Sequence, residues 1–180
     1  ESWMTRLNDS LSGKWSCPVF VANEGWGGIT TAGYLDMMKT NASWQNRMRF
    51  LKPDIWLIHL GVNDERGHVL PDDVGKNLDQ LVSLLVEQYG AKPEHIFIAK
   101  PCYDYFDGAE IILKSYCNEI DQLIEQRRLS SGPDFFAAYS KDKEKWYGAD
   151  PVHPNLEGMD RMADLWADAI FKALPRGPNP

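Results

Sequence analysis

The chain has 180 residues, which is enough for one domain with a sizeable core and too few to expect two. It carries 26 acidic against 19 basic side chains, a formal net charge of −7. This balance argues against nucleic acid as a partner, because neutralising phosphates requires clustered Lys and Arg. No apolar run approaches the roughly 20 residues of a membrane span, so we predict no membrane span.

The first half of the chain predicts a helix and two strands. Apolar residues fall on a helical stripe from Ser2 to Leu11. Two nearly continuous apolar runs follow, at 18–22 and 54–60. Because they lack the alternation of half-exposed strands, these runs indicate strands that are covered on both faces, as in a parallel sheet. Between them, Thr30 or Thr31 is placed to cap a further helix.

The second half of the chain predicts strands that alternate with longer helices. The predicted helices are 72–88, 109–128 and 155–174, and the predicted strands are 95–99 and, more weakly, 134–138. Alternation of this kind indicates βαβ units and therefore a three-layer α/β/α sandwich with a central parallel sheet. In such a sheet, ligands bind at the carboxyl ends of the strands, in the loops that follow them.

Two of these loops carry groups that can donate hydrogen bonds to an anion. Gly25, Gly27 and Gly28 follow the first predicted strand, and the backbone N–H groups of such a loop can point at a ligand. The glycine spacing matches neither a Walker loop nor a dinucleotide-binding loop. Asn63 follows the second strand in a Gly-Val-Asn-Asp turn, which is also compatible with a plain Asn/Asp turn. One N–H from Gly28 and the amide of Asn63 would suffice for the oxyanion of an acyl transfer.

Asp150 lies three residues before His153 in an Asp-Pro-Val-His-Pro segment, just ahead of the last predicted helix. An Asp that fixes the tautomer of a His leaves the other ring nitrogen to take a proton, which is two-thirds of a Ser-His-Asp triad. Asp and Pro are also ordinary turn residues, so the pair alone leaves a structural turn open.

Taken in chain order, the glycine-rich loop, the G-x-N-D turn and the D-x-x-H-P segment resemble the SGNH (GDSL) hydrolase superfamily. The resemblance covers most of the chain and is closest to the carbohydrate-esterase branch of the acetylxylan type. It implies a flavodoxin-like fold and a serine esterase that acts on small acyl, especially acetyl, esters of carbohydrates. It also implies His153 as general base, Asp150 as its orienting carboxylate, Gly28 and Asn63 as oxyanion donors, and no cofactor or metal.

The first motif of this superfamily is missing from the chain. That motif, Gly-Asp-Ser, ends the first strand and supplies the nucleophile, and no such strand precedes the first predicted helix. Ser10 and Ser2 are weak candidates, because a serine on a helix is poorly placed to face His153. We therefore leave the nucleophile unknown and expect the hydrolase domain at 1–174 to be N-terminally incomplete. The chain as given is then expected to have little activity, and a segment or second chain that supplies the first strand remains an open partner.

Two alternatives remain open at this point. The first keeps the superfamily and changes the substrate to a lysophospholipid or an acyl thioester. The second is a non-catalytic carbohydrate-binding or scaffold relative that lacks the nucleophile and uses exposed aromatic rings as stacking platforms. The candidate platforms are Trp26, Tyr103, Tyr105, Trp146 and Tyr147.

The remaining expectations concern single residues and the compartment. We expect His59 to be a core histidine rather than a ligand, and Asp64, Glu65 and Arg66 to form a solvated charge cluster rather than to shape the acyl or sugar pocket. Residues 175–180 predict a flexible tail. Three cysteines without metal-ligand spacing and two N-glycosylation sequons leave the compartment open, with secretion slightly favoured.

Overall fold

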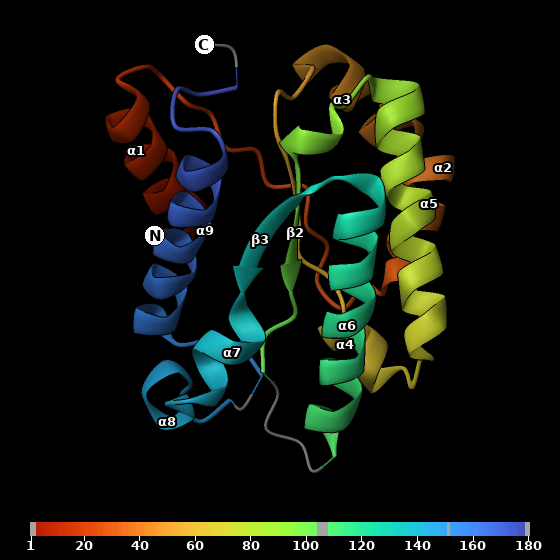
Figure 1. Ribbon diagram of the computed structural model, residues 1–180, viewed down its shortest axis with the longest axis vertical. Helices are drawn as coiled ribbons and strands as arrows, with labels where there is room; N and C mark the ends of the chain where they lie inside the picture. Colours follow the sequence, from red (N-terminus) through yellow and green to blue (C-terminus); the bar gives the residue numbers. More distant parts are fainter. Residues whose placement is uncertain (1–2, 104–107, 151, 179–180) are drawn as a thin grey trace.

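A parallel sheet lies between two helical layers in the computed structural model, which describes residues 3–103, 108–150 and 152–178 (Figure 1). The helices are α1 (Trp3–Trp15), α2 (Thr31–Thr40), α3 (Ala42–Leu51), α4 (Val62–Arg66), α5 (Pro71–Tyr89), α6 (Ala109–Arg127), α7 (Phe135–Ser140), α8 (Lys143–Trp146) and α9 (Leu156–Ala173), with a 3₁₀ turn η1 (Pro93–His95). None of the helices described is long and apolar enough to cross a membrane.

The sheet has three strands in the order β1-β2-β3, and both neighbouring pairs are parallel. The strands are β1 (Trp56–Ile58), β2 (Ile96–Lys100) and β3 (Ser130–Asp134). Parallel neighbours need a crossover between them, and here α5 lies between β1 and β2 and α6 between β2 and β3. The predicted α/β/α sandwich with a central parallel sheet is therefore confirmed.

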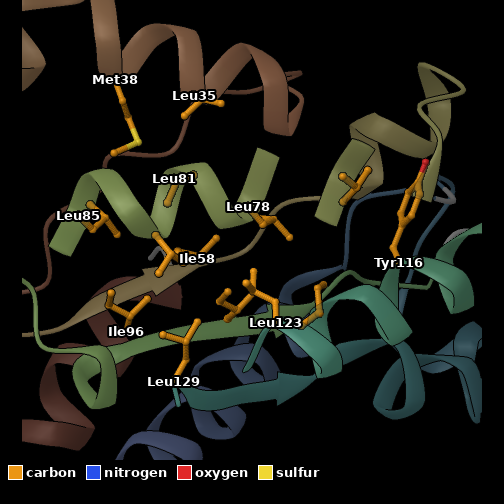
Figure 2. Close-up of a cluster of buried hydrophobic side chains, with 14 of the residues drawn as sticks. Leu35, Met38, Ile58, Leu78, Leu81, Leu85, Ile96, Tyr116, Leu123 and Leu129 are labelled. Atoms are coloured by element: carbon orange, nitrogen blue, oxygen red, sulfur yellow. The ribbon is translucent and has the colours of Figure 1, made fainter. Parts of the chain in front are cut away.

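The central strand β2 explains why the molecule has two separate cores. Ile96 and Ile98 belong to one buried cluster, while Phe97 and Ala99 belong to the other, because successive residues of a strand point to opposite faces. The first cluster packs under α2, α3, α5 and α6, and part of it is drawn in Figure 2. The second packs under α1, α7 and α9. Burial on both faces is the reason for the continuous apolar run that predicted this strand.

The longer helices begin and end close to their predicted limits. α5 ends at Gly90, which has a left-handed φ of +66° and caps the helix, as glycine does most readily. α6 and α9 also coincide with the predicted helices. α1 extends further than predicted, to Trp15, whose Nε1–H donates to the Leu174 carbonyl at 2.9 Å. At the C-terminal end of the chain, Gly177 is buried and lies against Trp15.

The strand predicted at 18–22 is wrong, because this segment is irregular in the structure. Val19 and Val21 pack against the second core cluster, but Phe20 between them is 79% exposed. The apolar pattern therefore identified a segment that packs on the core without a hydrogen-bonded strand beside it. As a result, β1 lies at an edge of the sheet that the described residues form.

The strand predicted at 134–138 is displaced toward the N-terminus. The observed strand β3 ends at Asp134, and α7 begins at Phe135. Asp134 caps that helix by accepting from the Ala137 N–H at 2.8 Å, and Phe135 and Tyr139 are both buried at helical spacing. Short apolar runs fit both a strand and a helix, and here the N-cap decides for the helix.

Candidate active site

The predicted site residues gather at one edge of the sheet. β2 and β3 both point toward the lower edge of Figure 1, where α4, α7 and α8 lie. α4 follows β1, α7 follows β3, and the segment before α9 contains the Asp-Pro-Val-His-Pro motif. This is the carboxyl edge of the sheet, where ligands bind in open α/β folds.

Asp150 and His153 are in direct contact in the structure. Nδ1 of His153 lies 2.5 Å from Oδ2 of Asp150, and the other carboxylate oxygen accepts from the backbone N–H groups of Val152 (2.8 Å) and His153 (3.3 Å). The hydrogen bond to His153 is the main reason that the pKa of Asp150 lies below its usual value. The His153 side chain is 76% exposed. A carboxylate on Nδ1 therefore holds an accessible imidazole whose Nε2 is available to exchange a proton.

The backbone around this pair is anchored on both sides. Tyr147 and Pro154 form an antiparallel bridge, and the Asn155 N–H donates to the Trp146 carbonyl at 2.8 Å. The Tyr147 hydroxyl donates to the carbonyl of Tyr103, in the loop after β2, at 2.6 Å. The segment that carries His153 is thereby tied both to α8 and to the loop of the central strand.

Asn155 fixes the start of α9 directly after this pair. Its side-chain oxygen accepts from the Gly158 N–H at 2.9 Å, and its amide donates to the carbonyls of Lys145 (2.8 Å) and Tyr147 (3.1 Å). Gly158 itself must lack a side chain, since a Cβ there would lie 2.5 Å from the Trp146 carbonyl oxygen. The first turn of α9 can therefore lie directly against α8.

The glycine-rich loop forms a tight turn with Gly28 at its third position. The Ile29 N–H donates to the Trp26 carbonyl at 3.4 Å, and Gly28 has a φ of +76°. A turn with positive φ at this position favours glycine. Gly28 is exposed, and nothing lies within 4 Å of where its Cβ would be. The backbone conformation, rather than lack of space, accounts for the glycine, and the turn is accessible to a small ligand.

Asn63 connects the turn after β1 to the glycine turn. Its amide donates to the Ile29 carbonyl at 3.0 Å, one residue beyond Gly28. Within the part of the chain that the structure describes, this carbonyl is the one hydrogen-bond partner of the amide. Since an Asn amide carries two N–H groups, the second is free to donate. Gly61, which starts this turn with a φ of +121°, lies close to Pro101, so a Cβ there would also be crowded.

The expectation of a solvated charge cluster at 64–66 is wrong for Asp64. Its side chain is fully buried, and it accepts from both the N–H and the hydroxyl of Thr31, the first residue of α2. The expected cap of α2 is also present, because the Thr30 hydroxyl accepts from the Gly33 N–H. Sequence reasoning missed the role of Asp64, although its place directly after Asn63 was a usable signal.

The two serine candidates are placed differently. Ser2 lies outside the described residues. Ser10 lies in α1, which runs alongside α9: Arg6 pairs with Asp160 and Asp164, and Lys14 is 3.8 Å from Asp168. This register places Ser10 on the order of 15 Å along the axis from the first residue of α9, at 1.5 Å per residue. His153 precedes that residue, so the structure does not bring Ser10 to it.

A second histidine near the sheet edge has the properties of a core residue. The ring of His59 packs on Phe135 with centroids 4.8 Å apart, and burial lowers the pKa of His59 to about 4. The Cys102 sulfur lies 3.7 Å from Nε2 of His59, but burial raises the pKa of this thiol to about 12. A neutral thiol beside a neutral imidazole is a poor nucleophile, so this contact does not supply the nucleophile of a triad.

The aromatic residues suggested as stacking platforms are mostly packed against protein. Tyr147 is buried, and Tyr103 and Trp146 are partly buried against the second core cluster. Trp26, in the glycine turn, is 50% exposed. Tyr105 lies outside the described residues. Trp26 is thus the candidate ring that remains well exposed in the described part of the chain.

Comparison with known proteins decides the family. The model of the GDSL-like Lipase/Acylhydrolase family matches residues 1–161. The chain belongs to the GDSL-like lipase/acylhydrolase family. The resemblance to SGNH (GDSL) hydrolases is therefore confirmed, and the expected enzyme class, an ester hydrolase, is confirmed with it. No curated protein sequence matches this GDSL-family chain significantly.

Solved structures of other hydrolases share the fold of this GDSL-family protein. An acetylxylan esterase, Axe2 from Geobacillus stearothermophilus, is 21% identical over 99% of this chain and 83% of its own, with a TM-score of 0.70. The psychrotrophic esterase EstA from a Pseudoalteromonas species is 19% identical over 97% and 88%, with a TM-score of 0.74. A lipase/acylhydrolase from Enterococcus faecalis is 19% identical over the same shares, with a TM-score of 0.72. At these identities the likeness establishes the fold.

Proposed function

We propose that this GDSL-family protein hydrolyses small acyl esters, and that its substrates are acetyl esters of carbohydrates. The observation that carries the proposal is the 2.5 Å contact between Asp150 and Nδ1 of His153, which leaves Nε2 accessible at the carboxyl edge of the sheet. A carboxylate in this position holds the imidazole in one tautomer and stabilises the imidazolium that forms when Nε2 takes a proton.

The proposed mechanism uses two groups of residues. A hydroxyl nucleophile attacks the ester carbonyl while Nε2 of His153 takes its proton, and the same nitrogen then gives that proton to the leaving alcohol. Water, which gives a proton to the same nitrogen, then attacks the acyl-enzyme, and the acid leaves as the hydroxyl takes the proton back. The developing oxyanion accepts from the Gly28 N–H and from the free amide N–H of Asn63, each worth roughly 3 kcal/mol of transition-state stabilisation. We assign the hydroxyl to none of the residues that the structure describes.

The carbohydrate part of the proposal rests on Trp26 and on the structural likeness to an acetylxylan esterase. The Trp26 ring is half exposed, two residues before the proposed oxyanion donor Gly28. A flat, exposed aromatic ring beside the reacting ester is a suitable platform for the apolar face of a sugar ring. A lysophospholipid or acyl thioester would need a long apolar channel, and no observation on the described residues favours one.

The test measures turnover of p-nitrophenyl acetate by the full-length gene product. We expect the substitution His153→Asn to lower kcat/KM at least about 10³-fold, because the base is removed while small polar character is kept. His68→Asn is the matched control: His68 is exposed, has a left-handed φ of +53° that Asn tolerates, and is expected to leave turnover unchanged. Full activity after His153→Asn would contradict the proposal.

The substrate class needs a second assay with the same proteins. We expect release of acetate from acetylated xylo-oligosaccharides, and we expect p-nitrophenyl octanoate to be a poorer substrate than the acetate. Trp26→Ala is expected to raise KM for the oligosaccharide and to leave turnover of p-nitrophenyl acetate nearly unchanged. Preference for the octanoate would favour the lipid alternative instead. A wild-type protein with no turnover of any ester would favour the non-catalytic alternative.

A further inference from the structure

The turn after β1 contacts the glycine turn at two points. Asn63 donates to the Ile29 carbonyl, and its neighbour Asp64 accepts from Thr31, two residues further along the chain at the start of α2. Ile29 directly follows Gly28, and Thr31 lies three residues after it. Two consecutive residues of one turn therefore hold the segment that determines where the Gly28 backbone lies.

The donor and the acceptor of each hydrogen bond to the Asp64 carboxylate can be assigned. The Thr31 N–H lies 3.0 Å from each carboxylate oxygen, and the Thr31 hydroxyl donates to Oδ1 at 2.5 Å. That hydroxyl has a single hydrogen, so it accepts the bond from the Asn77 amide at 3.1 Å. The three side chains thus form one directed chain from Asn77 through Thr31 to Asp64. Because Asp64 is completely buried, its carboxylate has no access to substrate or solvent.

The need to cap α2 does not explain why the Asp64 carboxylate is buried at the start of this helix. α2 already has a local N-cap, since the Thr30 hydroxyl accepts from the Gly33 N–H. Asp64 instead reaches the first residue of α2 from another element, α4, and its negative charge meets the positive end of the α2 dipole. A bond between two elements fixes their relative position, which a local cap cannot do.

We propose that Asp64 is a positioning residue, which sets the spacing of the two oxyanion donors by holding the start of α2, through Thr31, against the turn that carries Asn63. This inference rests on the proposed function. Asp64 does not touch the substrate; it acts through the loop that carries Gly28. Oxyanion donors act only when they are aimed at the position that the charge reaches in the transition state, so a small displacement of one donor lowers kcat more than it weakens substrate binding.

Substitution of Asp64 and Thr31 tests the proposal on turnover. In Asp64→Asn, one carboxylate oxygen becomes an N–H₂ group that faces the Thr31 N–H and repels it. We expect kcat for p-nitrophenyl acetate to fall about 10- to 100-fold, with KM changed less than about 3-fold. Thr31→Val removes the hydroxyl and is expected to behave alike, whereas the conservative Thr31→Ser restores the hydroxyl and should retain most of the activity.

Asn41→Ala is the control for a purely structural effect. Asn41 caps α3 by accepting from the Trp44 N–H at 3.0 Å, so its loss removes a comparable helix cap away from the carboxyl edge of the sheet. We expect this variant to lose stability with unchanged kcat. If Asp64→Asn and Asn41→Ala have the same kcat, the proposal is wrong.

Amide hydrogen exchange gives a readout that does not depend on turnover. We expect Asp64→Asn to speed exchange of the Thr31 N–H at least about 10-fold and to leave the amides of α5 unchanged, because one of the two oxygens that accept from Thr31 becomes an N–H₂ group while the core stays intact. Unchanged protection of the Thr31 N–H in Asp64→Asn would overturn the proposal. Absence of turnover in the wild-type protein would instead contradict the proposed function. Failure of the positioning role and failure of the proposed function therefore give different results.

Discussion

Asp150 and His59 lie in opposite environments near the strand ends. Asp150 is 53% exposed, and its hydrogen bond with His153 holds the pKa of the carboxyl below its usual value, so it is ionised at neutral pH. His59 is packed against Phe135, and burial lowers its pKa to about 4, so its imidazole is neutral. The Asp150 carboxylate that holds His153 is therefore charged and accessible, whereas the packed imidazole of His59 is neutral.

The neutral state of His59 predicts a pH dependence of stability. Unfolding returns its pKa to the ordinary value of about 6.5, so between pH 6.5 and pH 4 the unfolded chain binds a proton that the folded chain does not. This contribution to stability is present above pH 6.5 and is lost as the pH falls toward 4. Between pH 7.5 and pH 5 we expect a loss of about 2 kcal/mol in the free energy of unfolding from this residue.

Urea denaturation of the wild type and of His59→Phe at both pH values checks this expectation. Phe keeps a ring against Phe135 and removes the titrating group, so the variant should show a pH dependence smaller by about that amount. The other ionisable groups contribute equally to both proteins and cancel in the difference. Identical pH dependence in the two proteins would show that His59 is protonated equally in the folded and unfolded states.

At the scale of elements, α9 and the segment before it depend on Asn155. Its side chain caps α9 and also donates to two carbonyls of α8 and the residue after it, Lys145 and Tyr147. An ordinary N-cap satisfies one orphan N–H of a helix; this one additionally joins two helices across the segment that carries His153. The position of His153 therefore follows from the capping of the helix behind it.

We expect Asn155→Ala to lower the free energy of unfolding by about 1–2 kcal/mol, because a cap is lost and two carbonyls lose their donor. Thermal and urea denaturation measure the effect. Asn155→Asp keeps the acceptor for the Gly158 N–H and removes both donors, so it separates the cap from the link to α8. A loss below about 0.5 kcal/mol in Asn155→Ala would show that neither interaction stabilises the fold.

At the scale of the whole molecule, the sequence predicted helices and strands correctly wherever a local pattern determines the structure. The long helices have wide apolar stripes and clear stops, and β2 is apolar on both faces because two cores cover it. The strand prediction at 18–22 was wrong because a strand needs a hydrogen-bonded neighbour, and an apolar run in the sequence does not show whether one is present. The failure at 134–138 has a local cause, the Asp134 cap.

The candidate site was predictable to the extent that its residues are contiguous in sequence. Asp150 and His153 lie three positions apart, so one turn suffices to bring them together. The contact of Asp64 with Thr31 spans 33 residues and depends on how α2 packs beside α4, which no local pattern contains. A buried carboxylate and a solvated one look the same in a sequence, because the partner that makes burial tolerable is far away along the chain.

The open edge of β1 gives a prediction for the sheet as a whole. β2 is hydrogen-bonded on both sides and its Ile96–Ala99 stretch is buried, while β1 is paired on one side and Trp56 and Leu57 are only partly buried. Alternate N–H groups of a strand point to opposite edges, so in β1 the N–H groups that face away from β2 have no strand partner among the described residues. We expect these amides to exchange much faster than those of β2, which should open only with global unfolding.

Native-state hydrogen exchange followed by NMR measures this difference amide by amide. If every amide of β1 is as slow as those of β2, the edge is covered in solution, and the prediction is wrong. The dependence of this protection on protein concentration then identifies what covers the β1 edge. Protection that grows with concentration means that two copies pair through their β1 edges, as exposed apolar edge strands tend to do. Protection that is independent of concentration means that the cover belongs to the same chain, and the irregular segment at 18–22, whose Val19 and Val21 pack on the same core cluster as Leu57, is the nearest candidate.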